Sequence, residues 1–329
     1  ASPTCVMKFG ENGGAVGYLV GEENRGLANM FVMMNAARLG VGAQGVGVAE
    51  SATQHAVAYA KERYQGKSSN AKAASASPIV EHADVRRMLL TMKALTQAAR
   101  MICYATAKEL DIAHRASDEK MRGAARGRAA LLTPLAKAFS TDIANEVASL
   151  GVQVHGGMGF VEETGAAQFL RDARILPIYE GTNGIQAIDL VTRKLTLDGG
   201  APATSLLGEL GAIIASVRMA RRSEFGHMPE RLMEALSALQ SATLWMAQML
   251  PGQQEKALAS ATPFLRLMSL VTGGTFLAKG ALTKDAQSPY VAIARFFAEN
   301  ILTEARGLSD AIQYGADSVL VDAHGAVFA

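Results

Sequence analysis

Residues 85–102, VRRMLLTMKALTQAARMI, decide the fold class of this sequence. Apolar side chains recur there at positions 85, 88, 89, 92, 95, 99 and 102, a spacing that places them on one face of a helix. A similar pattern runs from Leu132 to Leu150, and a third helix is expected over residues 26–64. Three helices of this length predict a helical bundle.

A second group of helices is expected after Asp198–Pro202, whose glycines and proline mark a boundary between two domains. The polar stretches Gly66–Ser77 and Arg115–Arg122 are expected to be loops. The sequence therefore predicts a mainly α-helical protein, with a bundle domain at 23–198 and an additional helical domain at 203–329. The helices expected in the second domain span residues 204–222, 229–250, 254–280 and 289–320.

The only β structure expected lies at the start of the sequence. Two β-prone runs, Thr4–Phe9 and Ala15–Val20, flank Glu11–Gly14, which is typical of a hairpin turn. Because a lone hairpin is marginal in water, residues 1–22 are expected to be the remnant of a larger β domain. The first residues lack both Met and the pattern of a signal peptide, so the sequence is expected to begin inside a longer protein.

The composition argues against several classes of function. The 329 residues are 49% hydrophobic and carry a net charge of +2 without runs of like charge, so no nucleic-acid partner is expected. Cys5 and Cys103 form no disulfide or metal pattern, which fits a cytoplasmic location. The six histidines show no close ligand pairing, so no metal site is expected. No stretch approaches about 18 apolar residues without a charge, so no membrane span is expected.

Three short motifs match known ligand-binding patterns only in part. Gly40–Gly45 reads GxGxxG, but a helical pattern stands where a dinucleotide-binding fold needs a strand, so these glycines are expected to let another helix approach. Gly66–Ser68 resembles the end of a phosphate-binding loop, yet Lys61 stands where that loop needs glycine. His155–Gly159 resembles the oxyanion loop of esterases, but the sequence contains no GxSxG motif.

The segment from Gln153 to Gln186 is the strongest candidate for a functional site. Gln153–Phe160 is a turn whose glycines let a bound group touch the backbone, and Tyr179–Gly184 opens a helix that Thr182 or Asn183 could cap. Bare amides at a helix start favour anions such as a pyrophosphate. The residues alone also allow a simpler interpretation, a glycine-rich turn followed by a helix cap.

The order of these motifs resembles the C-terminal signature of acyl-CoA dehydrogenases. Gln153–Phe160, Arg171–Arg174 and Ile178–Gln186 match that signature, and three upstream segments fit the same order, so the resemblance covers residues 17–195. The tail, with Ala294–Glu299, resembles the extra helical domain of longer members such as methylthiopropionyl-CoA dehydrogenases. The upstream segments are Gly21–Leu27, Asn35–Arg38 and Lys61–Gly66.

The resemblance implies an FAD enzyme that removes two hydrogens from an acyl-CoA thioester. It implies that Glu180 is the base that takes the α-proton, while the β-hydrogen leaves as hydride to the flavin and an enoyl-CoA forms. Some relatives carry the base directly before the arginine of the earlier helix, where this sequence has Ala37.

The resemblance also assigns binding residues. It implies substrate contacts for Asn35, Arg38 and Gly181. For FAD, it implies contacts from seven residues, several of them commonly serving the flavin of a neighbouring subunit: Arg63, Gln65, Gln153, Gly156, Gly157, Thr182 and Asn183.

Partners and alternatives follow from the same resemblance. It implies an electron-transferring flavoprotein as electron acceptor, a homodimer or homotetramer, and a role in fatty-acid β-oxidation. Two alternatives stay open: an acyl-CoA oxidase of the same fold, and a helical assembly module without catalysis. The isolated chain is expected to fold and self-associate, but to be inactive, because the β domain that covers the flavin ring in the family is missing.

Overall fold

The protein is described by a computed structural model that covers residues 5–69 and 76–321. Within these ranges every secondary-structure element from Gly26 onward is a helix, and no β-strand forms. The β-type pairing found there is a single bridge between Tyr64 and Pro78. The mainly α-helical fold class predicted from the sequence is confirmed.

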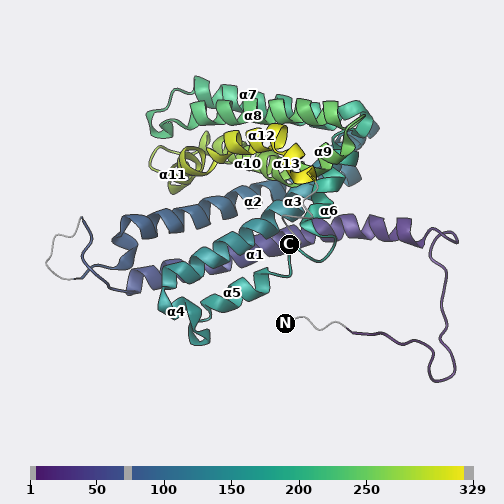
Figure 1. Ribbon diagram of the computed structural model, residues 1–329, viewed down its shortest axis with the longest axis horizontal. Helices are drawn as coiled ribbons and strands as arrows, with labels where there is room; N and C mark the ends of the chain where they lie inside the picture. Colours follow the sequence, from purple (N-terminus) through teal and green to yellow (C-terminus); the bar gives the residue numbers. More distant parts are fainter. Residues whose placement is uncertain (1–4, 70–75, 322–329) are drawn as a thin grey trace.

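Three long helices form the bundle predicted from the apolar spacing: α1 (Gly26–Glu62), α2 (Ala83–Arg115) and α3 (Glu119–His155). Each of them packs against the other two, and they lie across the middle of Figure 1. The apolar face predicted for α2 is buried, with Met92 and Ile102 fully enclosed. Side chains of this face stabilise the fold by removing apolar surface from water.

Two glycines of the GxGxxG stretch allow α1 and α3 to approach closely. A Cβ built on Gly42 would lie 2.6 Å from the carbonyl oxygen of Ala136, and one on Gly45 would lie 2.5 Å from that of Ser140. Gly40 faces open space. The prediction that these glycines serve helix packing is confirmed for Gly42 and Gly45, and no strand precedes them in the described chain.

Short elements follow α3 and carry the chain back along the bundle. The turn residues 174–182 connect α5 to α6. These elements are α4 (Gly157–Phe160), η2 (Glu162–Thr164), α5 (Ala166–Ala173), α6 (Asn183–Asp189), the π-helix η3 (Leu190–Lys194) and η4 (Leu197–Gly200).

The remaining helices form a second layer over α2 and α3, at the top of Figure 1. The central helix α10 is buried along most of its length, and its Gly273 lets it approach Ala98 of α2. One continuous apolar core joins both layers. The layer contains α7 (Ala201–Met219), η5 (Ser223–Phe225), α8 (Met228–Met249), α9 (Gln254–Ala259), α10 (Ala261–Ala281), α11 (Pro289–Phe296), the π-helix η6 (Phe297–Ile301), α12 (Glu304–Tyr314) and α13 (Ala316–Leu320).

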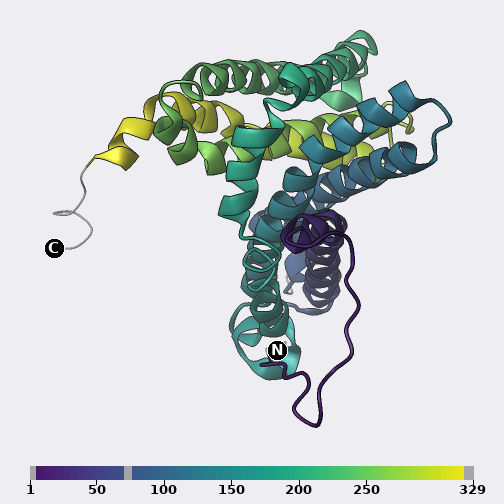
Figure 2. The same ribbon diagram turned by 90° about the vertical axis from the view of Figure 1, so that its right-hand side faces the viewer.

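The predicted β-hairpin is wrong for the residues that the structure describes. Residues 5–20 form no strand, and every described side chain before α1 is exposed. The turn itself forms, because the Gly14 amide donates to the Gly10 carbonyl at 3.1 Å. Figure 2 shows this segment extending away from the helices. Two strands that pack against nothing cannot stabilise each other in water. Thr4, the first residue of the predicted hairpin, lies outside the described residues.

Three expected boundaries differ from the structure. The helix predicted over 254–280 breaks at Ser260, and the one predicted over 289–320 is interrupted by η6 and by Gly315. The loop predicted at Arg115–Arg122 is shorter, because Asp118 caps α3 by accepting a hydrogen bond from the Lys120 amide at 3.0 Å. Residues 70–75 of the other predicted loop lie outside the described residues.

One helical stretch, Leu197–Met219, is long and apolar enough to cross a membrane by length and composition alone. The sequence pattern had predicted no such stretch. Leu206, Leu210 and Val217 of this stretch are fully buried in the core, and a core helix of a folded protein meets the same criterion.

Candidate functional site

The turn from Tyr179 to Asn183 presents Glu180 in an unusual backbone conformation. Glu180 has φ of 59° and Gly181 has φ of 81°, so two consecutive residues lie in the left-handed region. Glycine adopts this region freely, whereas glutamate does so at a cost. Such strain persists only where surrounding contacts hold the backbone, and it is frequent at functional sites.

Hydrogen bonds hold both ends of this turn. At its start, the Tyr179 hydroxyl donates to Oε1 of Gln44 on α1. At its end, the Asn183 amide donates to the Pro177 carbonyl at 2.9 Å, and the Thr182 hydroxyl caps α6 by accepting from the Ile185 amide. The helix start and cap predicted here from the sequence are confirmed, with Thr182 as the cap.

A buried lysine lies beneath the turn. Nζ of Lys137, on α3, donates to the Gly181 carbonyl oxygen and to Oδ1 of Asn183, both at 2.9 Å. Burial lowers the pKa of Lys137 to about 8; Arg38 lowers this pKa as well, while Asp142 and Glu180 raise it. Sequence reasoning missed Lys137, which stands in an ordinary helical pattern between Ala136 and Ala138.

The predicted substrate residues Asn35 and Arg38 lie near this turn. Arg38 is only 4% exposed; its Nη1 atom donates to Oδ1 of Asn35 at 3.3 Å and lies 3.5 Å from Oδ2 of Asp189. Asn35, Arg38, His114, Arg126 and Lys194 are among the residues that line a cavity of about 150 Å³. This cavity is rich in cationic side chains and suits an anionic group, but the Arg38 side chain is directed to protein partners.

Five of the predicted FAD residues line a second cavity at the other end of α1. Its volume is about 620 Å³, and its wall includes Arg63, Gln65, Gln153, Gly156 and Gly157. A Cβ added to Gly156 or Gly157 would meet no atom within 4 Å, so the glycine backbone is open to a ligand, and Gly156 has φ of 60°. One cation, two amide side chains and bare backbone fit the pyrophosphate and nucleoside of FAD.

A histidine in this cavity wall was missed as a binding candidate. His155 is 3% exposed, stacks on Tyr59 with ring centroids 4.3 Å apart, and its Nδ1 lies 2.7 Å from the Gly151 carbonyl. A carbonyl only accepts, so Nδ1 carries the proton. Nε2 is then an acceptor, and it has no partner in the described structure. In the sequence, His155 stands only in a partial esterase-like motif and outside any metal-ligand pattern.

The two groups of predicted residues lie far apart within one chain. The part of α1 from Arg38 to its end at Glu62 is roughly 36 Å long at about 1.5 Å per residue. Glu180, Gly181, Thr182 and Asn183 lie beside the first half of α1, and the 620 Å³ cavity lies at its end. The structure therefore brings together the residues within each group, but not the two groups.

Apolar side chains around Glu180 lie open to solvent. Glu180 itself is partly buried, while Ile178 and Ile185 in the same turn and helix are exposed. Leu27 and Met33 at the start of α1 are exposed as well. Exposed apolar side chains beside a strained turn are typical of a place where a ligand or another protein surface packs.

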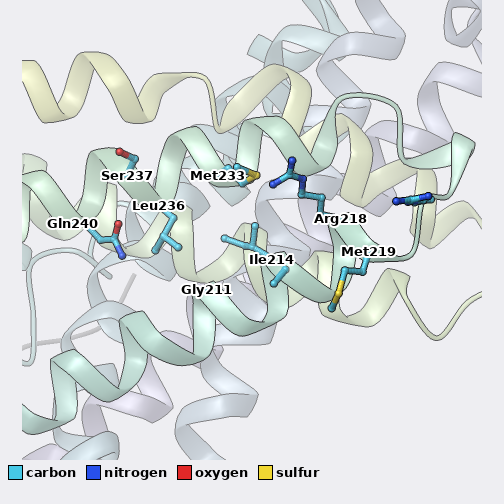
Figure 3. Close-up of a pocket in the computed structure, with 10 residues that line it drawn as sticks. Gly211, Ile214, Arg218, Met219, Met233, Leu236, Ser237 and Gln240 are labelled. Carbon is cyan, nitrogen blue, oxygen red and sulfur yellow. The ribbon is translucent and has the colours of Figure 1, made fainter.

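A cavity of about 780 Å³ between α7 and α8 lacks the groups that acid–base chemistry needs. Figure 3 shows Ile214 and Leu236 in its wall, with Arg218 and Met233 nearby. No carboxylate, histidine or cysteine is among its lining residues. Across the described ranges, no group of three or more His, Cys, Asp or Glu side chains could hold a metal ion.

Comparison with known proteins defines the class of this protein. Residues 24–195 match the family model of the acyl-CoA dehydrogenase C-terminal domain, and residues 206–321 match that of the acetyl-CoA dehydrogenase C-terminal-like domain. The chain therefore belongs to the acyl-CoA dehydrogenase family, as the resemblance of its motifs predicted.

Individual relatives support the same placement. The chain is 43% identical to 3-methylmercaptopropionyl-CoA dehydrogenase of Ruegeria pomeroyi and 32% identical to a butyryl-CoA dehydrogenase of Syntrophomonas wolfei, with 97% and 98% of the chain aligned. It spans 55% of the length of each. An acyl-CoA dehydrogenase of Bacillus anthracis, solved with FAD, has the same fold, with a TM-score of 0.72 and 20% identity over 91% of this chain and 53% of that one.

Proposed function

We propose that this chain is the catalytic C-terminal part of an FAD-dependent acyl-CoA dehydrogenase that converts an acyl-CoA thioester to the enoyl-CoA. The observation that carries the proposal is the turn at Glu180 and Gly181. Both residues have a positive φ, and Lys137 of α3 donates a hydrogen bond to the Gly181 carbonyl. The Glu180 side chain is only partly buried. The electrons are proposed to pass to an electron-transferring flavoprotein, and the enzyme to act in the cytoplasm in fatty-acid β-oxidation.

Glu180 acts as the base in this proposal. The α-proton of a thioester is weakly acidic, so the reaction needs a carboxylate at the proton and a donor at the carbonyl oxygen. The Glu180 side chain takes the proton, and its own backbone amide helps to hold the thioester oxygen. Exposed Ile178 and Ile185 provide apolar surface against which the reacting groups are shielded from water.

FAD, when bound, would supply the acceptor for the hydride equivalent that leaves the β-carbon. On this chain Arg63, Gln65, Gln153, Gly156 and Gly157 would hold the pyrophosphate and nucleoside end, because they line one cavity with an open glycine backbone. Thr182 and Asn183 would lie at the flavin end. The Thr182 side chain already caps α6, and the Asn183 side chain is already hydrogen-bonded to Asp142 of α3. Contacts from these two residues to FAD would therefore come from the side of the turn that faces away from α3.

The names of the relatives support a proposal for the substrate class. The Ruegeria and Syntrophomonas relatives are named for two different short acyl groups on coenzyme A. We therefore propose a short acyl-CoA as substrate, with Gly181 beside the thioester and Asn35 and Arg38 near the coenzyme A portion.

A second copy of the chain is proposed to complete each flavin site, in a homodimer or homotetramer. The Glu180 turn lies beside Gln44 of α1, and Arg63 follows the end of this helix at Glu62, so roughly 27 Å of helix separates the two groups. This separation supports the proposal that one flavin site takes the Glu180 turn of one chain and the Arg63 group of another. The isolated chain is accordingly expected to be inactive without the segment that precedes it in the relatives.

The direct test is Glu180→Gln in the full-length enzyme, meaning this chain together with the N-terminal half found in its relatives. The amide keeps the shape of the side chain but cannot accept the proton, so rapid mixing with butyryl-CoA should show flavin reduction slowed by at least about 10³-fold. Flavin content should stay unchanged. Glu163→Gln, in the exposed turn η2, is the matched control. Flavin reduction at the wild-type rate in Glu180→Gln would exclude Glu180 as the base.

A further inference from the structure

Lys137 is completely buried in the described structure, with 0% exposure. Lysine is almost never fully buried unless a carboxylate pairs with it, because an ammonium loses its hydration there. Among the ion pairs of the described residues, none within 4.0 Å involves Lys137; its two acceptors are the neutral oxygens of Gly181 and Asn183. Apolar packing between α1 and α3 alone would not need this ammonium.

Both acceptors of Lys137 belong to the turn that carries Glu180. The Gly181 carbonyl follows directly on the two residues with positive φ, so a hydrogen bond to it fixes the orientation of that peptide group. The Gln186 side chain also donates to this carbonyl, but at 3.4 Å, a longer distance than the 2.9 Å of Lys137. Lys137 is therefore the stronger restraint on the strained backbone.

The Asn183 side chain links this restraint to α3. Its Oδ1 atom accepts from Lys137, while its Nδ2 atom donates to Oδ1 of Asp142 at 2.7 Å and to the Ala138 carbonyl at 3.1 Å. The ammonium requires the oxygen of the amide and the carboxylate requires its nitrogen, so the two charges fix one orientation of Asn183. Gly181 and Asn183, which follow Glu180 in the turn, are thus both held by side chains of α3.

We propose that Lys137 is a positioning residue for Glu180: its ammonium anchors the Gly181 carbonyl and Asn183 from below and so directs the Glu180 carboxylate toward the substrate. This inference rests on the proposed function, in which Glu180 is the base. Lys137 does not touch the reacting atoms. Its charge also lies within electrostatic range of Glu180, together with Asp142 of its own helix and Arg38 of α1.

The test is Lys137→Met in the full-length enzyme, which keeps the length of the side chain and removes the ammonium. Lys93→Met is the matched control, because Lys93 pairs with Glu50 on the same bundle, and Arg100 keeps Glu50 paired when Lys93 is removed. We expect the rate of flavin reduction by butyryl-CoA to fall about 100-fold in Lys137→Met, since a displacement of about 1 Å at a reacting group has that effect. Lys93→Met should react at the wild-type rate.

Three further measurements separate positioning from a general loss of structure. Flavin content and butyryl-CoA affinity, measured by spectral titration, should change less than about threefold in Lys137→Met. When pH rises through about 8 and the Lys137 ammonium loses its proton, the neutral amine keeps two N–H donors for Gly181 and Asn183, so the wild-type rate should fall by far less than the loss caused by Lys137→Met, and Lys137→Met should show no change at this pH. Lys137→Gln, whose amide can still donate to Gly181, should recover part of the rate, and it replaces Lys137→Met if that variant does not fold.

The outcomes distinguish this inference from the proposed function. A wild-type rate in Lys137→Met, or a slow rate caused only by lost flavin, would overturn the role of Lys137 while Glu180→Gln still abolishes reduction. If Glu180→Gln keeps the wild-type rate, the proposed function itself fails. Equal rates in Lys137→Gln and Lys137→Met would also count against a role of its hydrogen bond to Gly181.

Discussion

Gly45 on α1 lies so close to Ser140 on α3 that a Cβ on Gly45 would come within 2.5 Å of the Ser140 carbonyl oxygen. This atom belongs to the backbone of a buried helix, so it cannot move aside as the end of a flexible side chain could. The close approach brings Lys137, one turn earlier on α3, under the Glu180 turn. Packing of these two helices and placement of the site are therefore linked.

Gly45→Ala should destabilise the protein, because the added methyl group forces α1 away from α3. We expect a loss of about 1–3 kcal/mol in the free energy of unfolding. Gly47→Ala is the control, since a Cβ there would meet no atom within 4 Å. Replacing an exposed helical glycine should stabilise by about 0.5–1 kcal/mol. Urea unfolding of both variants measures the difference, and equal stability would show that the close contact is not required.

Arg63→Ala should weaken FAD retention more than it slows the chemical step. Arg63 lines the 620 Å³ cavity, and a cation facing a pyrophosphate contributes equally to binding in the ground and transition states. We expect FAD affinity to fall roughly tenfold to hundredfold. Flavin absorbance after dialysis measures the loss, and added FAD should restore the rate. Lys61→Ala, an exposed cation on the same helical turn, should retain its flavin. Equal flavin content in Arg63→Ala and wild type would contradict the assignment.

Glu50 should make stability depend on pH. Burial raises its pKa, but hydrogen bonds from Lys93, Gln54 and Arg100 outweigh this effect and lower the pKa to about 2, below the ordinary value of 4.5. A carboxyl with a depressed pKa stabilises the folded state above about pH 4.5, and this contribution is lost as pH falls toward 2. Glu50→Gln should therefore cost on the order of 2 kcal/mol at pH 7, and the difference from wild type should shrink between pH 4.5 and pH 2.

Denaturant unfolding at pH 7, 4 and 3 would measure this dependence. Glu62→Gln, which changes an exposed carboxylate at the end of the same helix, is the control and should show little difference from wild type at any of these pH values. A constant difference between Glu50→Gln and wild type across this range would mean that the ion pairs of Glu50 do not set its pKa.

The helical bundle could be predicted from the sequence because the spacing of apolar residues within one helix determines which of its faces is buried. Apolar spacing in residues 85–102 places Met92 and Ile102 on one face whatever they pack against, and both are buried. The hairpin prediction failed for the opposite reason. Residues 5–20 have the turn and the β-prone runs, but strands need partners, and no partner is present in the described chain.

The candidate site could be predicted only where a motif marked it. Glu180 and the glycines after Gln153 stand in recognisable segments, and the structure places them in two separate groups of predicted residues. Lys137 and Tyr59 have no such signal. Each is one residue of a regular helix, and its relation to the site depends on how α1 and α3 cross, which no single-sequence pattern specifies.

The last prediction concerns the two separated groups of residues on α1. If a second copy completes each site, then Arg63 of one chain serves the flavin whose substrate is deprotonated by Glu180 of the other. A mixed oligomer of Arg63→Ala chains and Glu180→Gln chains then contains one intact site, formed by the unchanged Glu180 of the first and the unchanged Arg63 of the second.

The matched control places both changes in one chain and pairs it with a wild-type chain. That oligomer has the same four residues, yet each of its sites lacks either Arg63 or Glu180. Oligomers carrying two different affinity tags can be purified in both arrangements, and flavin reduction by butyryl-CoA can be compared per bound flavin. We expect the mixed single variants to reduce about half of their sites at the wild-type rate, and the control to show flavin loss at one site and no rapid reduction at the other. The reverse pattern, with activity in the control alone, would mean that one chain supplies both groups to the same flavin.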